Sequence, residues 1–495
     1  MVVHLFGATS SPSCANYALR KTASELKGTF DNQVVDTVLK NCYVDDCLKS
    51  VSSTNKAIAL ISNIQSLLKQ GGFRIAKWVS NDRDVINFVP VEERAKEIKD
   101  LDLDQDSVPI DRALGIQWCV DSDKFHFNID VKDKPATRRG ILSMTSSVFD
   151  PLEFLAPFCL VGKSILQELC RLGIGWDDAI PQVLSEKWTQ WLCDLEKLSE
   201  FKVNRCLKPS GFGEIVAADL HHFADASEIG YGVVSYLRIE NEEGNTYCSF
   251  IMGKSRVTPL KQVTIPRLEL TAATVAVRTN KMILKELEIP VQRSYFWIDS
   301  MTVLRYIKNT TSRFHTFVAN RLAVIHEGSN IFDWRYISTK LNPADLASRG
   351  VSAEGLLRMD QWIVPPDFLL KSTNEWPDSL NCDSDIVCTS DPEVKKVSVS
   401  TIVTSQPNQD NWFDILNKLI DHNSSWYSLK RSVGWILKVR KELLRRVSNK
   451  KEDIKMTLVK ESDSIFTCLS SRAIHLEVFR HCVKVKFIGK RTLRY

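Results

Sequence analysis

The pattern of apolar and polar positions over residues 213–350 predicts one ordered run of strands and helices. Three apolar strands come first, separated by turns that contain Gly230 and Gly244. A helix, a strand, two helices, a strand and a last helix follow. We place them at Glu214–Asp225, Tyr231–Leu237, Thr246–Met252, a helix from Pro266, Ser294–Ile298, Thr302–Lys308, Arg313–His326, Phe332–Ile337 and a helix from Asn342. This order predicts a mixed five-stranded sheet with flanking helices.

The pattern in the N-terminal third predicts a β-hairpin over residues 34–51, with Tyr43-Val44-Asp45-Asp46 at its turn. A helix over Thr54–Lys69 follows, and Gly71-Gly72 ends it. Strands are expected at Phe73–Asn81 and around Leu114–Trp118. These elements indicate an α+β region before the mixed sheet.

Residues 351–410 have little periodic structure and are rich in Pro, Ser, Thr and Asp, which predicts a linker. A helical pattern resumes at Trp412, and residues 431–460 hold ten Lys or Arg against three acids. Such a basic segment is compatible with nucleic-acid binding, and equally with a solvated helix face.

Length and composition describe a globular chain of several domains. At 495 residues, with 44% hydrophobic and 25% charged residues, we expect about two to four domains. The thirteen cysteines form no Cys-x-x-Cys pair, which predicts neither a zinc knuckle nor a disulfide framework, but a reduced, intracellular protein. No apolar run approaches the roughly 18 residues of a membrane span, and the first residues lack the basic n-region of a secretory signal.

Four acids stand where predicted strands end or helices begin: Asp225, Glu269, Asp299 and Asp345. Two divalent cations about 4 Å apart need shared oxygen ligands, and Mg²⁺ or Mn²⁺ prefers carboxylates to His or Cys. The pattern therefore predicts a two-metal phosphodiester nuclease. For Asp345 an alternative stays open, because an acid in the first turn also stabilises a helix without any metal.

Several segments of the N-terminal part resemble the reverse transcriptase of BEL/Pao-type LTR retrotransposons. They are Phe6–Pro12, Tyr43–Asp46, Lys77–Asn81, Leu114–Trp118 and Ser147–Leu152 followed by Leu155-Ala156-Pro157. The family's glycine after Pro-Leu is replaced here by Glu153. The resemblance implies that Asp45 and Asp46 are metal ligands of a polymerase palm. The third palm carboxylate lies upstream of residue 1 in the family, so we expect no polymerisation.

The middle part resembles the RNase H of the same retrotransposons, which carries four acidic motifs. The matching segments are Phe223–Ser227, Pro266–Leu270, Trp297–Ser300 and Asn342–Gly350. The resemblance implies cleavage of the RNA strand in RNA–DNA hybrids with two Mg²⁺ or Mn²⁺ ions, and Asp225, Glu269, Asp299 and Asp345 as catalytic metal ligands. Phosphate contacts are expected from the basic residues beside this site, Lys254, Arg256, Lys261 and Arg267.

Residues 466–477 resemble an early strand pair of the family's integrase core, without its first aspartate or zinc module. We therefore expect a retrotransposon Pol fragment of mixed α/β and α+β domains. Its parts are a palm remnant and thumb (1–110), a connecting region (111–205), an RNase H-like domain (206–352), a linker (353–410), a basic helical segment (411–460) and an inactive integrase remnant (461–495).

Two alternatives to the nuclease stay open. One is a relic or co-opted protein that binds nucleic acid without catalysis. The other is a Pao-type aspartic peptidase, which the chemistry favours least because Asp36-Thr37-Val38 is the nearest string to the required Asp-Thr-Gly loop. The expected partners are an RNA–DNA hybrid and other Pol segments, with no membrane. The expected location is intracellular, in a cytoplasmic particle or the nucleus.

Overall fold

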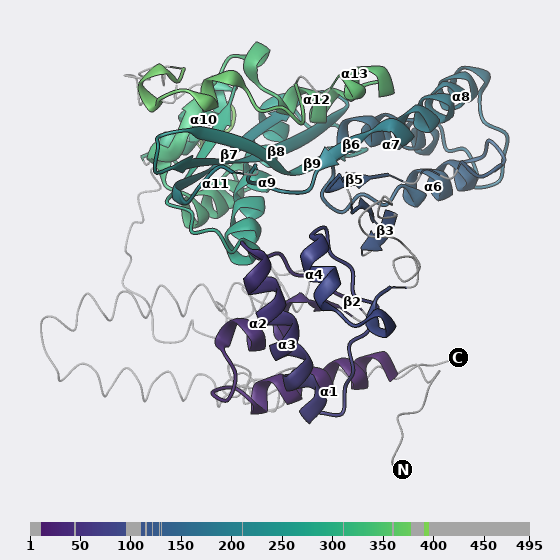
Figure 1. The fold of residues 1–495 in the computed structure, drawn as a ribbon. Coiled ribbons are helices and arrows are strands. Elements are labelled where there is room, and N and C mark those ends of the chain that lie inside the picture. Colours follow the sequence, from purple (N-terminus) through teal and green to yellow (C-terminus); the bar gives the residue numbers. More distant parts are fainter. Residues whose placement is uncertain are drawn as a thin grey trace, which may run out of the picture. The chain divides into compact units, whose positions relative to one another are not determined.

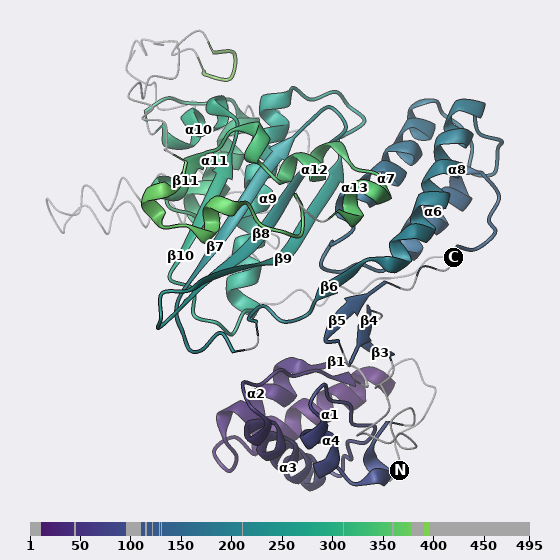
Figure 2. The same ribbon diagram turned by 45° about the horizontal axis from the view of Figure 1, so that its top comes forward.

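The computed structural model is shown in two views in Figures 1 and 2. It describes residues 11–43, 46–95, 110–113, 116–120, 122–127, 129, 131–209, 211–309, 311–358, 361–377 and 391–395. The predicted basic segment 411–460 and the integrase remnant 461–495 lie outside these residues. None of the described helices combines the length and apolarity needed to cross a bilayer.

The N-terminal part is a small helical cluster followed by short extended segments. Its elements are α1 (Ser11–Glu25), α2 (Asn32–Asn41), β1 (Cys42–Tyr43), β2 (Asp46–Cys47), α3 (Thr54–Gln70), α4 (Arg83–Phe88) and the 3-10 turn η1 (Val91–Glu93). Helix α3 confirms the predicted helix, and Gly71 caps its end with a backbone N–H that bonds back to Leu68 and Lys69. The buried faces of α1, α2 and α3 share one apolar cluster.

Two sequence predictions fail in this part. Residues 34–41 belong to helix α2, not to a strand, because Asp31 caps the helix and Val34, Val35 and Val38 fall on one buried helical face. The predicted strand Phe73–Asn81 is only an isolated bridge between Trp78 and Arg94. In both segments the β-branched composition favours strand, but burial against the helices decides the structure.

The central element is a five-stranded mixed sheet with the order β11-β10-β7-β8-β9. Its strands are β7 (Ile215–Ala226), β8 (Gly230–Asn241), β9 (Thr246–Val257), β10 (Arg293–Ile298) and β11 (Trp334–Tyr336). Strands β7, β8 and β9 are antiparallel neighbours, whereas β10 runs parallel to both β7 and β11. The predicted fold class of this region, a mixed five-stranded sheet with flanking helices, is confirmed.

Helices cover both faces of the sheet (Figure 1). They are α9 (Ile265–Glu286), α10 (Met301–Lys308), α11 (Thr316–Gly328) and α12 (Ala344–Arg349), with the 3-10 turns η3 (Ile331–Asp333) and η4 (Thr339–Leu341). Successive strand residues point to opposite faces. Phe296 and Ile298 of β10 therefore pack with α9, α10 and α11, while Tyr295 and Trp297 pack with α12 on the other face.

The connecting region shares its hydrophobic core with this sheet. Its elements are β3 (Ile110–Ala113), β4 (Ile116–Cys119), β5 (Lys124–His126), α6 (Arg138–Ser147), α7 (Ala156–Arg171), α8 (Gln182–Lys197), the 3-10 turn η2 (Leu198–Glu200) and β6 (Lys202–Asn204). Strands β3 to β6 form a separate antiparallel sheet. One apolar cluster runs from Phe158 of α7 to Phe250 of β9. The predicted boundary at residues 205/206 stays a prediction, but a cut there would divide this core.

Residues 353–358 and 361–377 were expected in a linker, and the structure packs them on the sheet instead. They contain α13 (Ala353–Leu357), η5 (Asp367–Leu370) and η6 (Thr373–Glu375). Trp362 is 1% exposed; its indole N–H donates to the Phe154 carbonyl at 2.8 Å, and its own carbonyl accepts from the Tyr236 hydroxyl at 2.7 Å. A fragment that ends at residue 352 would therefore expose the face of the sheet that Trp362 covers.

Candidate active site

Asp225 lies at the end of the central strand β7 and is the most buried of the four predicted acids, at 5% exposed. Its carboxylate accepts a hydrogen bond from the Ser348 hydroxyl of α12. Burial and then the negative charge of Asp299 raise the pKa of Asp225 to about 7, and Asp345 adds to the rise. The hydrogen bond from Ser348 opposes these effects without cancelling them.

Asp299 directly follows β10, the parallel neighbour of β7. Ile298 pairs with Ala224 in the register of these strands, so Asp299 and Asp225 leave the sheet at the same edge. The next residue, Ser300, caps helix α10 through a bond from the Val303 N–H. Carboxyl ends of parallel strands meet at one edge of a sheet, which is why residues far apart in sequence come together here.

Glu269 is the fifth residue of α9, just beyond the first turn in which the sequence placed it. Its carboxylate accepts a hydrogen bond from the Ser300 hydroxyl. Burial raises the pKa of Glu269, and the charge of Asp299 contributes in the same direction. Asp299 therefore interacts electrostatically with both Asp225 and Glu269, which makes it the central acid of the group.

Asp345 is half-buried in the short helix α12, which packs closely on β8. A Cβ atom at Gly232 would lie 2.4 Å from the Ala347 Cβ, so the approach of α12 requires glycine there. The helix begins one residue later than predicted: Pro343 is the cap residue, while the Asn342 side chain accepts from the Ala344 N–H at 3.1 Å. The Asp345 carboxylate pairs with the Arg349 guanidinium at 2.6 Å.

The structure thus brings the four predicted acids into one neighbourhood, but it does not aim them at a common centre. Within the described ranges, no set of three or more His, Cys, Asp or Glu side chains is arranged so that it could hold a metal ion. The donor chemistry itself fits Mg²⁺ or Mn²⁺, because these ions take carboxylate oxygens. Before sharing an ion, Asp225 and Asp345 would have to reorient away from Ser348 and Arg349.

Two side chains of this site were not predicted as functional. Ser348 holds Asp225, and Ser300 holds Glu269 while it also caps α10. Both serines entered the sequence predictions only as members of the segments Trp297–Ser300 and Asn342–Gly350. A serine gives no periodic signal of its own, so its contact with a carboxylate 123 residues away is visible only in the fold.

The basic residues predicted to contact phosphate are largely paired with carboxylates. Lys254 and Arg256 of β9 both contact Glu153, at 3.2 and 3.1 Å, and Glu153 also accepts from the Ser255 N–H. Glu153 has a φ of +57°, in the left-handed region where glycine is favoured. A glutamate at this position is therefore strained, and its contacts with β9 offset that strain.

Arg267, two residues before Glu269, is bound by Glu393. Its guanidinium makes two bonds to the Glu393 carboxylate, at 2.6 and 3.1 Å, and Glu393 is 8% exposed. The segment around Glu393 is fixed by a β-bridge between Phe314 and Val394. Lys261, the fourth predicted cation, is exposed in the loop before α9.

The predicted polymerase ligands are only partly described. Asp45 lies outside the described residues, and Asp46 is exposed in the two-residue strand β2. Tyr43 pairs with Asp46 across β1 and β2, so the hairpin itself is present. The roles of Asp45 and Asp46 as metal ligands stay predictions.

Two buried histidines of β7 are core residues. His222 bonds to the Ser235 hydroxyl through Nδ1 at 2.8 Å and to the Asn280 side-chain oxygen through Nε2 at 3.0 Å. This requires the tautomer with the proton on Nε2, which donates to Asn280. Burial lowers the pKa of His222 to about 4, and burial also lowers the pKa of His221.

We expect His222 to make folding sensitive to acid. The unfolded chain takes up this proton near pH 6.5 and the folded chain only near pH 4, so the unfolded state binds more protons between these values. The stabilisation is fully present above about pH 6.5 and is lost as pH falls, by about 3 kcal/mol in total. Urea unfolding of the wild type and of His222→Gln from pH 4.5 to 7.5 tests this; equal pH slopes would contradict it.

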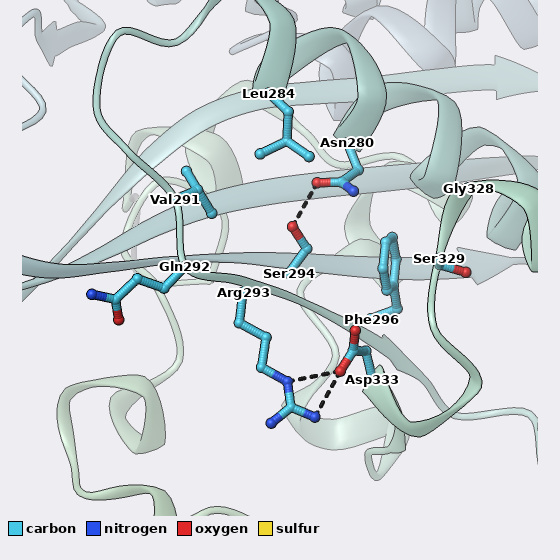
Figure 3. A pocket seen from close by; sticks show the side chains of 10 residues that line it. All are labelled: Asn280, Leu284, Val291, Gln292, Arg293, Ser294, Phe296, Gly328, Ser329 and Asp333. Atoms are coloured by element: carbon cyan, nitrogen blue, oxygen red, sulfur yellow. Dashed lines mark hydrogen bonds and ion pairs between the residues drawn. The ribbon is translucent and has the colours of Figure 1, made fainter.

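A cavity of about 250 Å³ lies away from the acids. Its lining includes Arg293 and Ser294 at the start of β10, whereas Asp299 follows the other end of that strand. Figure 3 shows the Arg293 guanidinium paired with Asp333 beside this cavity, at 2.7 Å. The cavity is therefore not part of the acidic site.

The strand order and the helices on both faces define this part of the chain as an RNase H-like domain. Residues 137–300 match the family model of the Pao retrotransposon-like RNaseH-like domain. The matched range contains Asp225, Glu269 and Asp299 and begins in the connecting region, where α6 to α8 lie. The match thus supports the retrotransposon resemblance for this domain, while the reverse transcriptase and integrase assignments stay predictions.

Solved RNase H structures are similar to part of this chain. The N-terminal RNase H domain of a Mycobacterium tuberculosis protein shares 9% identity over 29% of this chain and 99% of that domain, with a TM-score of 0.20. RNase H1 of Halobacterium salinarum shares 12% identity; the match covers 28% of this chain and 97% of that chain, with a TM-score of 0.19. LC11-RNase H1, solved with an RNA/DNA hybrid, shares 13% identity; the match covers 29% of this chain and 98% of that chain, with a TM-score of 0.18. With TM-scores this low, the fold assignment depends on the strand order and not on these structures. No curated protein matches the chain.

Proposed function

We propose that the chain is a divalent-metal-dependent endonuclease that cleaves the RNA strand of RNA–DNA hybrids. The observation that carries the proposal is the meeting of Asp225 and Asp299 at the ends of two parallel strands, with Glu269 and Asp345 beside them. Burial, and then the negative charge of Asp299, raise the pKa of Asp225 to about 7, which supports a site where negative charge is poorly compensated. A pair of cations would relieve that repulsion.

Each acid has a separate task in this proposal. Asp225 and Asp299 would hold the ions at the sheet edge, while Glu269 and Asp345 would complete the ligand sets from helices α9 and α12. When bound, the ions supply an activated water and stabilise the leaving 3′-oxygen. Ser300 and Ser348 are positioning residues, because each donates a hydrogen bond to a carboxylate and so sets its orientation.

The substrate class follows from the retrotransposon RNaseH-like match and from the cations near the site. A hybrid is distinguished from DNA by its 2′-hydroxyl groups and its near-A-form shape. Lys254, Arg256, Lys261 and Arg267 are proposed to contact phosphates. Three of them would exchange Glu153 or Glu393 for the substrate backbone, so substrate and protein carboxylates compete for the same cations.

Glu393→Gln should therefore tighten binding of a hybrid. The substitution keeps the size of the side chain but removes its charge, which frees Arg267 for a phosphate. We expect an affinity gain of about threefold to tenfold and a steeper salt dependence, by about one phosphate contact. Fluorescence anisotropy with a labelled hybrid in EDTA at several salt concentrations measures both.

The matched control for that experiment is Glu354→Gln, which removes an exposed carboxylate paired with Arg358. Glu354→Gln should change neither the affinity for the hybrid nor the salt dependence of that affinity. The double variant Arg267→Ala/Glu393→Gln should lose the gain. Equal affinity of Glu393→Gln and wild type would show that Arg267 does not contact the nucleic acid.

The nuclease itself is tested with the full chain and an end-labelled RNA–DNA hybrid. We expect cuts inside the RNA strand in Mg²⁺ or Mn²⁺, none in EDTA, and none in duplex DNA or single-stranded RNA. A folded chain that leaves the hybrid intact in both metals would contradict the proposal. Primer extension on the same hybrid should give no product, because polymerase activity is not expected.

The second candidate is a protein that binds nucleic acid without cutting it. Two observations favour it: the carboxylates do not share a common centre within the described residues, and three of the proposed phosphate contacts are paired with acids. Hybrid binding without metal-dependent cleavage would support this candidate. The peptidase alternative has no structural support, because Asp36 and Thr37 lie within helix α2 and Thr37 is fully buried.

A further inference from the structure

Cys42 and Cys47 face each other across the short hairpin formed by β1 and β2. The neighbouring residues on the side away from the turn are Asn41 and Leu48, and the Leu48 N–H donates a hydrogen bond to the Asn41 carbonyl at 3.1 Å. Hydrogen-bonded and non-hydrogen-bonded pairs alternate along an antiparallel ladder, so Cys42 and Cys47 form a non-hydrogen-bonded pair. In such a pair the Cα atoms are about 4.5 Å apart and the side chains approach most closely.

This separation falls within the range of about 4.4–6.8 Å that a disulfide spans between its Cα atoms. The two thiols also interact, because a side-chain hydrogen bond with Cys47 raises the pKa of Cys42. Both residues are half-buried, and Cys42 packs against the apolar cluster of α1, α2 and α3. A bond between the sulfurs would therefore need little movement of the backbone.

In the described part of the chain, the two other strand cysteines lie opposite residues that are not cysteine. Cys119 of β4 lies opposite Ile110, and Cys248 of β9 lies opposite Arg238. Cys14, Cys193 and Cys206 are exposed and free. The pairing of Cys42 with Cys47 is thus a property of the hairpin register and not of cysteine content.

We propose that Cys42 and Cys47 form an oxidation site that closes to a cross-strand disulfide by exchange with a small disulfide of the oxidised glutathione class. One of the two cysteines attacks, as its thiolate, one sulfur of the oxidant and releases one glutathione thiolate. The other cysteine then loses its proton and attacks the protein sulfur of the mixed disulfide, which releases the second glutathione. The protein dithiol is oxidised, and one glutathione disulfide is reduced to two thiols.

The pairing follows from the register of the hairpin, because cross-strand neighbours in a non-hydrogen-bonded pair are held together in the folded chain. Either thiol can therefore react first, and the other then lies beside the mixed disulfide. The closed bond would fix the register of the strands that carry Tyr43 and Asp46, independently of any nuclease activity.

Peptide mapping of the full chain tests the site directly. The reduced protein is equilibrated in glutathione buffers of increasing oxidised fraction, quenched with acid and N-ethylmaleimide, and digested with trypsin. Lys40 and Lys49 bound one tryptic peptide, Asn41–Lys49, that contains both cysteines. We expect this peptide to become two hydrogens lighter and to escape alkylation, while Cys14 and Cys193 are alkylated or carry glutathione.

The decisive comparison is between the folded chain and the same chain in concentrated urea. The folded hairpin should reach half-oxidation in a buffer at least about tenfold more reducing than the unfolded chain requires, because the register holds the thiols together. Cys42→Ser should leave Cys47 only as a mixed disulfide, and Cys193→Ser should change nothing. Equal midpoints in the folded and unfolded chains, or mixed disulfides alone in the wild type, would overturn the proposal.

Discussion

Asp299→Asn should lower the rate of RNA-strand cleavage by about 10³-fold or more, or roughly 4 kcal/mol of transition-state stabilisation. Asp299 is the acid whose charge acts on both Asp225 and Glu269, so its neutralisation removes a ligand at the centre of the group. The amide keeps the size of the side chain. Single-turnover cleavage of a labelled hybrid in Mg²⁺ gives the rate.

Asp333→Asn is the matched control for this change. Asp333 pairs with Arg293 at the start of β10, beside the cavity, whereas Asp299 follows the opposite end of that strand. Its loss removes an ion pair without touching the four acids, so cleavage should stay within about twofold of wild type, since such pairs contribute little. If both variants cut at the wild-type rate, the acidic site is not the catalytic one.

Asp225→Asn should stabilise the metal-free protein while it abolishes cleavage. The folded pKa of Asp225 is about 7, against about 3.9 in an unfolded chain. The folded state therefore binds the extra proton between these values, and the stability associated with it is lost as pH rises through 7. Above pH 8 the neutral variant should have a free energy of unfolding higher by up to about 4 kcal/mol in EDTA.

Bound Mg²⁺ should reverse the order of stability of the wild type and Asp225→Asn. A ligand that binds only the folded state stabilises it by mass action, so Mg²⁺ should raise the free energy of unfolding of the wild type and not that of Asp225→Asn. Urea unfolding at pH 8.5 with EDTA and with Mg²⁺ gives all four values. A variant that is no more stable than wild type in EDTA would show that the charge of Asp225 is better compensated than its burial indicates.

Much of the central domain could be predicted from local pattern. Apolar alternation located β7, β8, β9 and β10, and the helix predicted at Thr302–Lys308 is α10. The acids at the strand ends followed from the same pattern, because a strand that ends in Asp225 or Asp299 leaves that residue at the edge of the sheet. The sequence failed at α2, where β-branched residues with a helical burial pattern indicated a strand.

The sequence could not predict that the proposed phosphate-binding side chains are paired with carboxylates. Lys254 and Arg256 are separated from Glu153 by 101 and 103 residues, and Arg267 from Glu393 by 126. The sequence marked Glu153 as unusual for its position but gave no sign of its partners. Its left-handed backbone directs the side chain to β9, and only the packed chain shows that contact.

The sequence by itself therefore determined the element order of the RNase H-like domain and the four acids, because strand and helix periods and caps depend on neighbouring residues. The tertiary structure decided which charges meet. It placed Asp299 beside Asp225 and Glu269, added Ser348 to the site, and packed residues 353–358 and 361–377 on the sheet. These contacts depend on burial and on strand order across long sequence separations, and local periodicity carries no information about either.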